Sequence, residues 1–193
     1  MKTLKTFYAL ALMLATSLIS INQVKAQKIP RVEQPDSFNR IHVKGNVEVT
    51  LIQRDKFGLN YAESNTGVVK VIQQGHALTI SSNSFEPAKL IVYVDENFFR
   101  ISAAENATIH TEGKLQLNYL QLFLKDHSSA EINSQTKGLY TVISDKSMLK
   151  LIGLTQDHNL VMGKTPKLNT SDFVALKLTT LPISENILAA RGN

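Results

Sequence analysis

A repeat of 19 residues in the C-terminal half constrains the fold more than any other feature of this sequence. Mainly apolar residues with an internal spacing of 0, +6 and +8 recur in it: Leu124, Ala130 and Ile132; Ile143, Leu149 and Leu151; Met162, Leu168 and Thr170; Leu181, Ile187 and Ala189. A further copy, Ile101, Ala107 and Ile109, stands 23 residues before the first. One coil of this length cannot bury both ends of its strands. Coils stacked about 4.8 Å apart bury them by placing each position above itself.

The repeat therefore predicts two apolar columns inside an all-β solenoid. The first column contains Ile101, Leu124, Ile143, Met162 and Leu181, and the second contains Ala107, Ala130, Leu149, Leu168 and Ile187. We interpret the fold as a right-handed parallel β-helix (β-solenoid) with about 19-residue coils, because parallel crossovers are generally right-handed. A leucine-rich repeat would need an Asn ladder and a helical segment, and an antiparallel sandwich would not explain the constant register.

The N-terminal part of the same domain is predicted to be more irregular β structure. Apolar residues alternate from Ile41 to Leu51, with a turn or bulge at Gly45-Asn46, and residues 89–94 form the strongest strand pattern. Ile41, Val47 and Val49 repeat the 0, +6, +8 spacing. We expect one domain over 37–193, with irregular coils over 37–97 and regular coils over 98–193.

The first residues have the pattern of a secretory signal peptide. A basic start precedes a mainly apolar run over 7–21, and Val24-Lys25-Ala26 resembles a cleavage site, so 1–26 is the predicted signal and 27–36 a flexible arm. The run is too short for a transmembrane segment. We expect an exported protein in the periplasm, on the outer-membrane surface or outside the cell. Without Lys2, Lys5 and Lys25 the 21 basic residues become 18 against 16 acidic ones, which does not favour nucleic-acid binding.

No catalytic constellation stands out in the sequence. Asp126-His127-Ser128 contains the residue types of a triad, but adjacent residues rarely converge on one substrate, so we interpret it as a solvated turn. Asp157-His158 is interpreted in the same way, as a coil linker. Weak candidates for a surface site are Arg100, Glu105, Lys125, Asp126 and His127, and charges on a solvated face are the simpler reading. The histidines lack metal-ligand spacing, and we predict neither a metal nor a cofactor.

The sequence resembles the GIN domain, an auto-transporter adhesin head domain common in secreted proteins of Bacteroidetes. The resemblance rests on residues 38–53, the central strand over 90–94, and small-residue corners at 103–107 and 126–130. It implies an all-β, β-helix-like fold and an exported location. The hypothesis that follows is a non-enzymatic module that binds an unknown glycan, protein or envelope partner. The alternatives are a polysaccharide-active enzyme on the same scaffold, and a structural component that self-associates.

Overall fold

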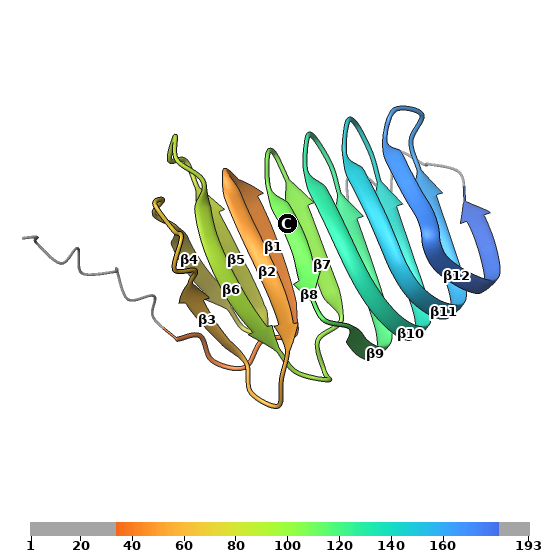
Figure 1. Cartoon of the computed structure of the whole chain (residues 1–193), viewed down its shortest axis with the longest axis horizontal. Coiled ribbons are helices and arrows are strands. Elements are labelled where there is room, and N and C mark those ends of the chain that lie inside the picture. Colours follow the sequence, from red (N-terminus) through yellow and green to blue (C-terminus); the bar gives the residue numbers. More distant parts are fainter. Residues whose placement is uncertain (1–33, 182–193) are drawn as a thin grey trace, which may run out of the picture.

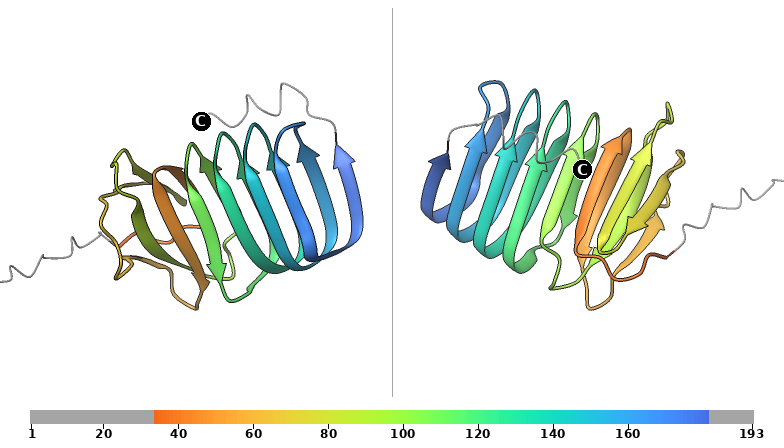
Figure 2. Two further views of the ribbon diagram at one scale, coloured as in Figure 1. Left: turned by 45° about the horizontal axis from the view of Figure 1, so that its top comes forward. Right: turned by 180° about the vertical axis from the view of Figure 1, so that it is seen from behind.

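The computed structural model describes residues 34–181, and this part of the chain is all-β. Twelve strands form one sheet, and no helix occurs among the described residues. Figure 1 and Figure 2 show the sheet curled on itself, with tight turns along one edge and rounded bends along the other. The strands are β1 (Arg40–Gly45), β2 (Val47–Gln53), β3 (Gly58–Tyr61), β4 (Lys70–Gln74), β5 (Ala77–Ser82), β6 (Ala88–Val94), β7 (Arg100–Ala104), β8 (Thr108–Glu112), β9 (Leu115–Leu124), β10 (Ser129–Ile143), β11 (Met148–Met162) and β12 (Lys167–Leu181).

Each C-terminal coil runs along two opposite flanks of the curled sheet. The first part of β10 pairs with β8 and its last part pairs with β9, so this 15-residue strand contributes to both flanks. β11 and β12 follow the same path in parallel register. We call the side with β6, β2, β8 and the first parts of β10–β12 the β8 flank. The side with β5, β1, β7 and the last parts of β9–β12 is the β7 flank.

The N-terminal coils do not stack in chain order. β1 lies between β5 and β7, and β2 lies between β6 and β8, all in parallel pairs. Two short strands close this end of the stack, since β3 pairs antiparallel with β6 and β4 pairs antiparallel with β5. The prediction of an all-β fold is confirmed, but the sheet is mixed rather than wholly parallel. The turn predicted at Gly45-Asn46 joins β1 to β2.

The structure bears out the 19-residue register in the middle of the repeat and corrects it at both ends. Leu124 pairs with Ile143 and Ala130 pairs with Leu149, each at an offset of 19. The offset of 23 for the earlier copy was wrong. β7 pairs with β9, and β8 pairs with β10, each at an offset of 21. Ala130 accordingly pairs with Ile109 rather than Ala107, and the partner of Ile101 is Leu122. Side chains alternate with a period of two, so an error of two residues leaves the inward pattern unchanged.

The last step of the first predicted column is also wrong. A bulge between Lys150 and Ile152 changes the offset to 20, so Leu181 pairs with Val161 instead of Met162. One inserted residue moves every later side chain to the other face of the strand. Leu181 therefore lies on the outer face. Ile187 and Ala189, the next predicted repeat positions, are outside the described residues.

The interior is apolar at the N-terminal end and partly polar further along. Buried Ile, Leu and Val side chains line β1, β2, β5 and β6, whereas Thr136, Thr141, Thr155 and His158 are buried among the later coils. The Thr136 hydroxyl donates to Thr155 at 2.8 Å, and His158 Nε2 lies 3.0 Å from Thr141 Oγ1. The expectation of a solvated linker at His158 was wrong, because this residue is 2% exposed within β11. The bend there is gradual and keeps the strand continuous.

Candidate binding faces

The tight turns along one edge of the sheet contain four of the five residues singled out in the sequence. Glu105, Asp126 and Asp145 begin successive turns with φ values of 59°, 60° and 57°. The Glu105 N–H donates to the Asp126 carboxylate at 3.0 Å, and the Asp126 N–H donates to the Asp145 carboxylate at 3.2 Å. A short acidic side chain tolerates the left-handed conformation and bonds to nearby backbone. The carboxylates of Asp126 and Asp145 therefore hold neighbouring turns together.

The Asp126-His127-Ser128 sequence is part of this turn structure. The Ser128 side chain is fully buried, and its hydroxyl donates to the carbonyl oxygens of Lys125 and Ala103 at 2.7 and 3.2 Å. The His127 N–H donates to the Glu105 carbonyl at 2.9 Å. Because the hydroxyl is directed into the protein, these adjacent residues do not form a catalytic triad.

Arg100 is not close to the other sequence candidates. It begins β7, whereas Glu105 lies in the turn after that strand ends. At about 3.3 Å per residue, five residues of nearly extended chain place them about 16 Å apart. The structure brings Glu105, Lys125 and Asp126 together along the turn edge and places Arg100 on the outer face of the β7 flank.

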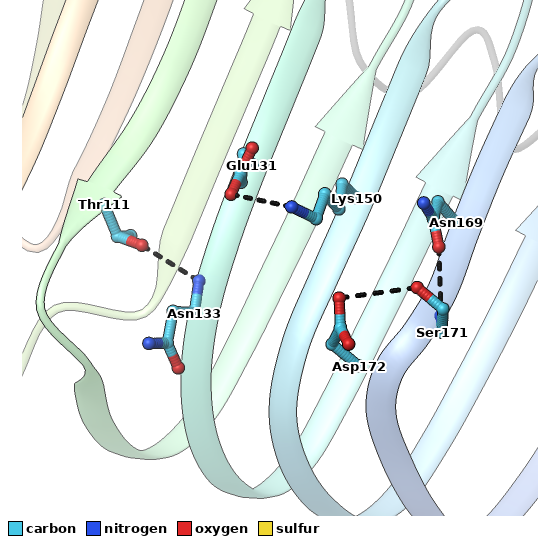
Figure 3. Close-up of polar contacts among 7 residues, drawn as sticks. All are labelled: Thr111, Glu131, Asn133, Lys150, Asn169, Ser171 and Asp172. Atoms are coloured by element: carbon cyan, nitrogen blue, oxygen red, sulfur yellow. Dashed lines mark hydrogen bonds and ion pairs between the residues drawn. The ribbon is translucent and has the colours of Figure 1, made fainter.

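The outer face of the β8 flank has matched charges. The Lys150 ammonium lies 3.1 Å from the Glu131 carboxylate (Figure 3). Further toward the N-terminal end, the Glu48 carboxylate is 3.8 Å from the Lys89 ammonium and 4.0 Å from His110 Nε2. Exposed ion pairs of this kind contribute at most about 1 kcal/mol each. The opposite charges within each pair neutralise one another, so these residues present little net charge to a ligand.

Backbone and amide contacts complete this β8 face. The Asn133 N–H donates to the Thr111 hydroxyl at 2.9 Å, and the Ser171 N–H donates to the Asn169 side-chain oxygen at 3.0 Å (Figure 3). A shallow hollow of about 450 Å³ crosses the strands here. Its lining residues include Thr108, His110, Ser129, Glu131, Met148, Lys150, Lys167 and Asn169. The surface is continuous, and Glu131, Lys150 and Asn169 on it already have partners in the protein.

The outer face of the β7 flank has two arginines side by side. Arg40 on β1 and Arg100 on β7 are register partners. Neither guanidinium has a carboxylate within 4.0 Å among residues 34–181. Arg100 Nε donates to the Gln121 side-chain oxygen at 2.8 Å, and its guanidinium lies 5.1 Å from the centre of the Phe123 ring. Burial lowers the pKa of Arg100, and the charge of Arg40 lowers it further.

Two further observations describe the surroundings of the two arginines. Arg40 Nε is buried and has no hydrogen-bond partner. Two residues along β1, burial lowers the pKa of His42, and the charges of Lys44 and Lys125 lower it further against the opposing effect of Glu105. Arg40 and Arg100 therefore repel one another, and among the described residues neither has an ion pair of the kind found on the β8 flank.

A second hollow, of about 480 Å³, lies on the β7 flank beside the arginines. One row of its lining continues the Arg40–Arg100 row across β9–β12, through Gln121, Tyr140, Asn159 and Thr179. The neighbouring row contains Tyr119, Gly138, Asp157 and Lys177. Tyr119 is 66% exposed. A Cβ at Gly138 would be 2.8 Å from that ring, so glycine allows the ring to lie against the strand.

The sequence identified Arg100 but missed the other residues of this face. The offset of 23 aligned Arg100 with Phe123, whereas the true offset of 21 aligns it with Gln121 and with the row that follows. Arg40 aligns with Arg100 at an offset of 60, which no local repeat reveals. The sequence signal that could have pointed to this face is Tyr119, an aromatic residue that alternates with the apolar inward positions Leu120 and Leu122.

Residues 34–181 contain no group of three or more His, Cys, Asp or Glu side chains placed to hold a metal ion. In the same range, no helix is long and apolar enough to cross a membrane. The geometry that remains is that of an extended surface, with side chains that repeat from strand to strand.

Comparison with known proteins agrees with this architecture. The family model described as "Putative auto-transporter adhesin, head GIN domain" matches residues 37–182. The chain belongs to this family. For this GIN-domain protein, the resemblance suggested by residues 38–53 and the small-residue corners is confirmed. A search of curated proteins finds no match.

Solved structures share the fold at low sequence identity. A "putative adhesin" from Bacteroides fragilis has a TM-score of 0.62 and 15% identity, over 77% of this chain and 73% of the other. A "putative adhesin" from Parabacteroides distasonis has a TM-score of 0.55 and 13% identity, over 78% and 76%. A "putative lipid binding protein" from the same species has a TM-score of 0.55 and 10% identity, over 78% and 77%. At these identities the likeness concerns the fold.

Proposed function

We propose that this GIN-domain protein is an exported, non-enzymatic module that binds or adheres to a partner at the cell envelope. The observation that supports this best is the outer face of the β7 flank, where Arg40 and Arg100 lack acidic partners and border an open hollow. Side chains that repeat from strand to strand suit an extended ligand, as on other solenoids. The adhesin descriptions within the family support the same role.

A binding experiment on the mature chain tests the proposal. Residues 27–193 would be immobilised and exposed to solubilised envelope fractions, extracellular matrix and a glycan array. Reproducible retention of at least one component is expected, and a captured polysaccharide should keep its chain length after prolonged incubation. Absence of binding to all three materials would contradict an adhesion role, and shortening of the polysaccharide would indicate an enzyme.

We propose that residues 1–26 are a cleaved signal, that 27–36 form an arm, and that 37–193 form a single domain. Mass spectrometry of the protein recovered from its native cell should give an N-terminus at Gln27. Protease treatment of intact cells would then distinguish a surface location from the periplasm. An N-terminus at Met1 on the exported protein would contradict cleavage.

We also propose that the parallel coils wind in the right-handed sense of a β-helix. The parallel pairing of β8 with β10 and of β10 with β11 supports a continuous coil, and right-handed crossovers predominate among parallel strands. An experimental structure that showed left-handed coils would overturn this assignment.

Self-association is a second role that one observation favours. Among residues 34–181, β12 pairs only with β11, and its Val174, Leu176 and Leu178 side chains are exposed. An open edge strand with apolar side chains can pair with another chain. Light scattering on the mature protein should show mass rising with concentration, and Leu176→Lys should abolish the rise. A constant monomer mass at high concentration would argue against assembly.

A further inference from the structure

We propose that the hollow on the β7 flank binds an acidic polysaccharide that runs across β1, β7 and β9–β12, with its carboxylate or sulfate groups at Arg40 and Arg100. The inference rests on the binding role proposed above and specifies its site and ligand class. It starts from charge. Two adjacent guanidiniums with no acid within 4.0 Å among the described residues are destabilised by mutual repulsion, which an anion placed between them would relieve.

The orientation of the two arginines favours an oxyanion. Arg100 uses its Nε to bind Gln121 and stacks near the rings of Phe123 and Phe99, at 5.1 and 5.8 Å. These contacts fix the plane of the guanidinium, and a fixed plane suits recognition of a carboxylate or sulfate group by paired N–H donors. Arg40 has a buried Nε without a hydrogen-bond partner, and no acidic side chain among the described residues lies within 4.0 Å of its guanidinium.

The row beyond the arginines has the chemistry expected for sugar hydroxyls. Gln121, Tyr140, Asn159 and Thr179 follow one another on neighbouring strands, about 4.8 Å apart. Each offers a polar group that can donate and accept hydrogen bonds. Beside them the exposed Tyr119 ring presents an apolar face with a polar tip, which suits the flat face of a sugar ring.

The same arrangement disfavours other polymers. A peptide that adds to a sheet uses the backbone of an edge strand, whereas this hollow crosses strands on a face whose backbone is already paired. A nucleic acid carries a phosphate at every nucleotide, and binds strips of basic residues. Here the basic side chains are interrupted: Arg40 and Arg100 lie at one end, neutral side chains follow, and Asp157 stands between Lys137 and Lys177 in the lining. A polymer with acidic groups at intervals and hydroxyls between them fits this distribution.

The test compares defined probes on the mature chain. Polygalacturonate supplies carboxylates, heparin supplies sulfates, dextran is neutral, and single-stranded DNA is the phosphate polymer. We expect binding to at least one of the two acidic polysaccharides and at least tenfold weaker binding to dextran and to DNA. Equal binding to dextran would overturn the acidic class, and tighter binding to DNA would overturn the polysaccharide class.

Variants locate the site. The double variant Arg40→Gln, Arg100→Gln should weaken acidic-polysaccharide binding at least tenfold, and Tyr119→Ala about threefold or more. The matched control is Lys150→Gln, Lys167→Gln, which removes the same charge from the β8 flank and should change affinity less than twofold. Arg100→Lys, which keeps the charge and loses the planar fork, should show an intermediate loss. Thermal unfolding of every variant checks that the fold is retained, and Tyr119→Ala, at an exposed position, keeps the site testable if the arginine variant does not fold.

The outcomes separate this inference from the proposed function. Equal loss in the two double variants would mean non-specific attraction to net charge and would overturn the site. Binding of the mature chain to envelope material but to neither acidic polysaccharide would overturn the ligand class while leaving the binding role intact. Absence of binding to all materials would remove both.

Discussion

Two glycines with nearly the same positive φ should respond very differently to substitution by alanine. Gly45 in the turn after β1 has φ 80°, and Gly113 between β8 and β9 has φ 79°. A Cβ at Gly45 would lie 2.0 Å from the Ser82 carbonyl oxygen, whereas a Cβ at Gly113 would meet nothing within 4 Å. The pair therefore separates the cost of the left-handed conformation from the cost of a steric clash.

The expected magnitudes follow from these two terms. A positive φ costs an L-residue about 1–2 kcal/mol, and the reduced freedom of the unfolded chain returns about 0.4–1 kcal/mol. Gly113→Ala should then destabilise the fold by about 1 kcal/mol. At Gly45 the Ser82 carbonyl must also retreat, which breaks the 3.1 Å hydrogen bond from the Asn46 N–H. Overpacking and the lost bond together add about 2–3 kcal/mol.

Urea unfolding of the mature chain, followed by circular dichroism, measures both variants. The midpoint should fall about three to four times further for Gly45→Ala than for Gly113→Ala, with unchanged slopes. The corresponding melting temperatures should fall by about 9–12 °C for Gly45→Ala and about 3 °C for Gly113→Ala, at about 3 °C per kcal/mol for a domain of this size. Equal losses would refute the reasoning, because they would mean that β1 and β5 do not approach as closely as Gly45 and Ser82 indicate.

Three further predictions concern the interior and the β8 flank. Burial lowers the pKa of His158, so the unfolded chain binds a proton at this imidazole more readily than the folded protein does, and the free energy of unfolding should fall as the pH drops below about 6.5. His158→Gln should reduce the difference in unfolding free energy between pH 7 and pH 5, and an unchanged difference would contradict this. Ile109→Ala removes a fully buried side chain and should cost about 2–5 kcal/mol by urea unfolding, whereas a loss below 1 kcal/mol would mean that the core is loosely packed there. A double-mutant cycle on Lys150 and Glu131, which are 38% and 52% exposed, should give a coupling of at most about 1 kcal/mol that disappears at 1 M salt, and a salt-independent coupling would contradict an exposed pair.

The sequence predicts the fold where strands follow one another in the chain. From Leu124 to Leu168 each coil stacks on the one before it, so a constant offset of 19 gives the pairing directly. The constant offset fails at the Lys150–Ile152 bulge. Polar and apolar residues alternate imperfectly there, so the sequence pattern does not reveal the one inserted residue. The offset fails again at Ile101, because an error of two residues preserves the inward pattern.

The candidate site was harder to predict than the fold. Its arginines come from β1 and β7, which are 60 residues apart in the sequence and adjacent in the sheet. Inward positions are recognisable because burial requires apolar side chains. Outward positions have no comparable requirement, and only the correct register shows which of them form a row. The polar side chains of β9–β12 are recognisable as one row with the arginines only when Arg100 is aligned with Gln121.

The position of the first coil has a consequence for how the chain acquires its structure. β1 pairs on one side with β5, which comes 37 residues later in the chain, and on the other side with β7, which comes 60 residues later. A chain that emerges N-terminus first therefore holds two unpaired strand edges until about residue 112 is available. From Ser129 onward, each new coil can pair with the coil that precedes it in the chain. We therefore expect folding to be slow and prone to aggregation while distant strands must pair, and faster once coils add in chain order.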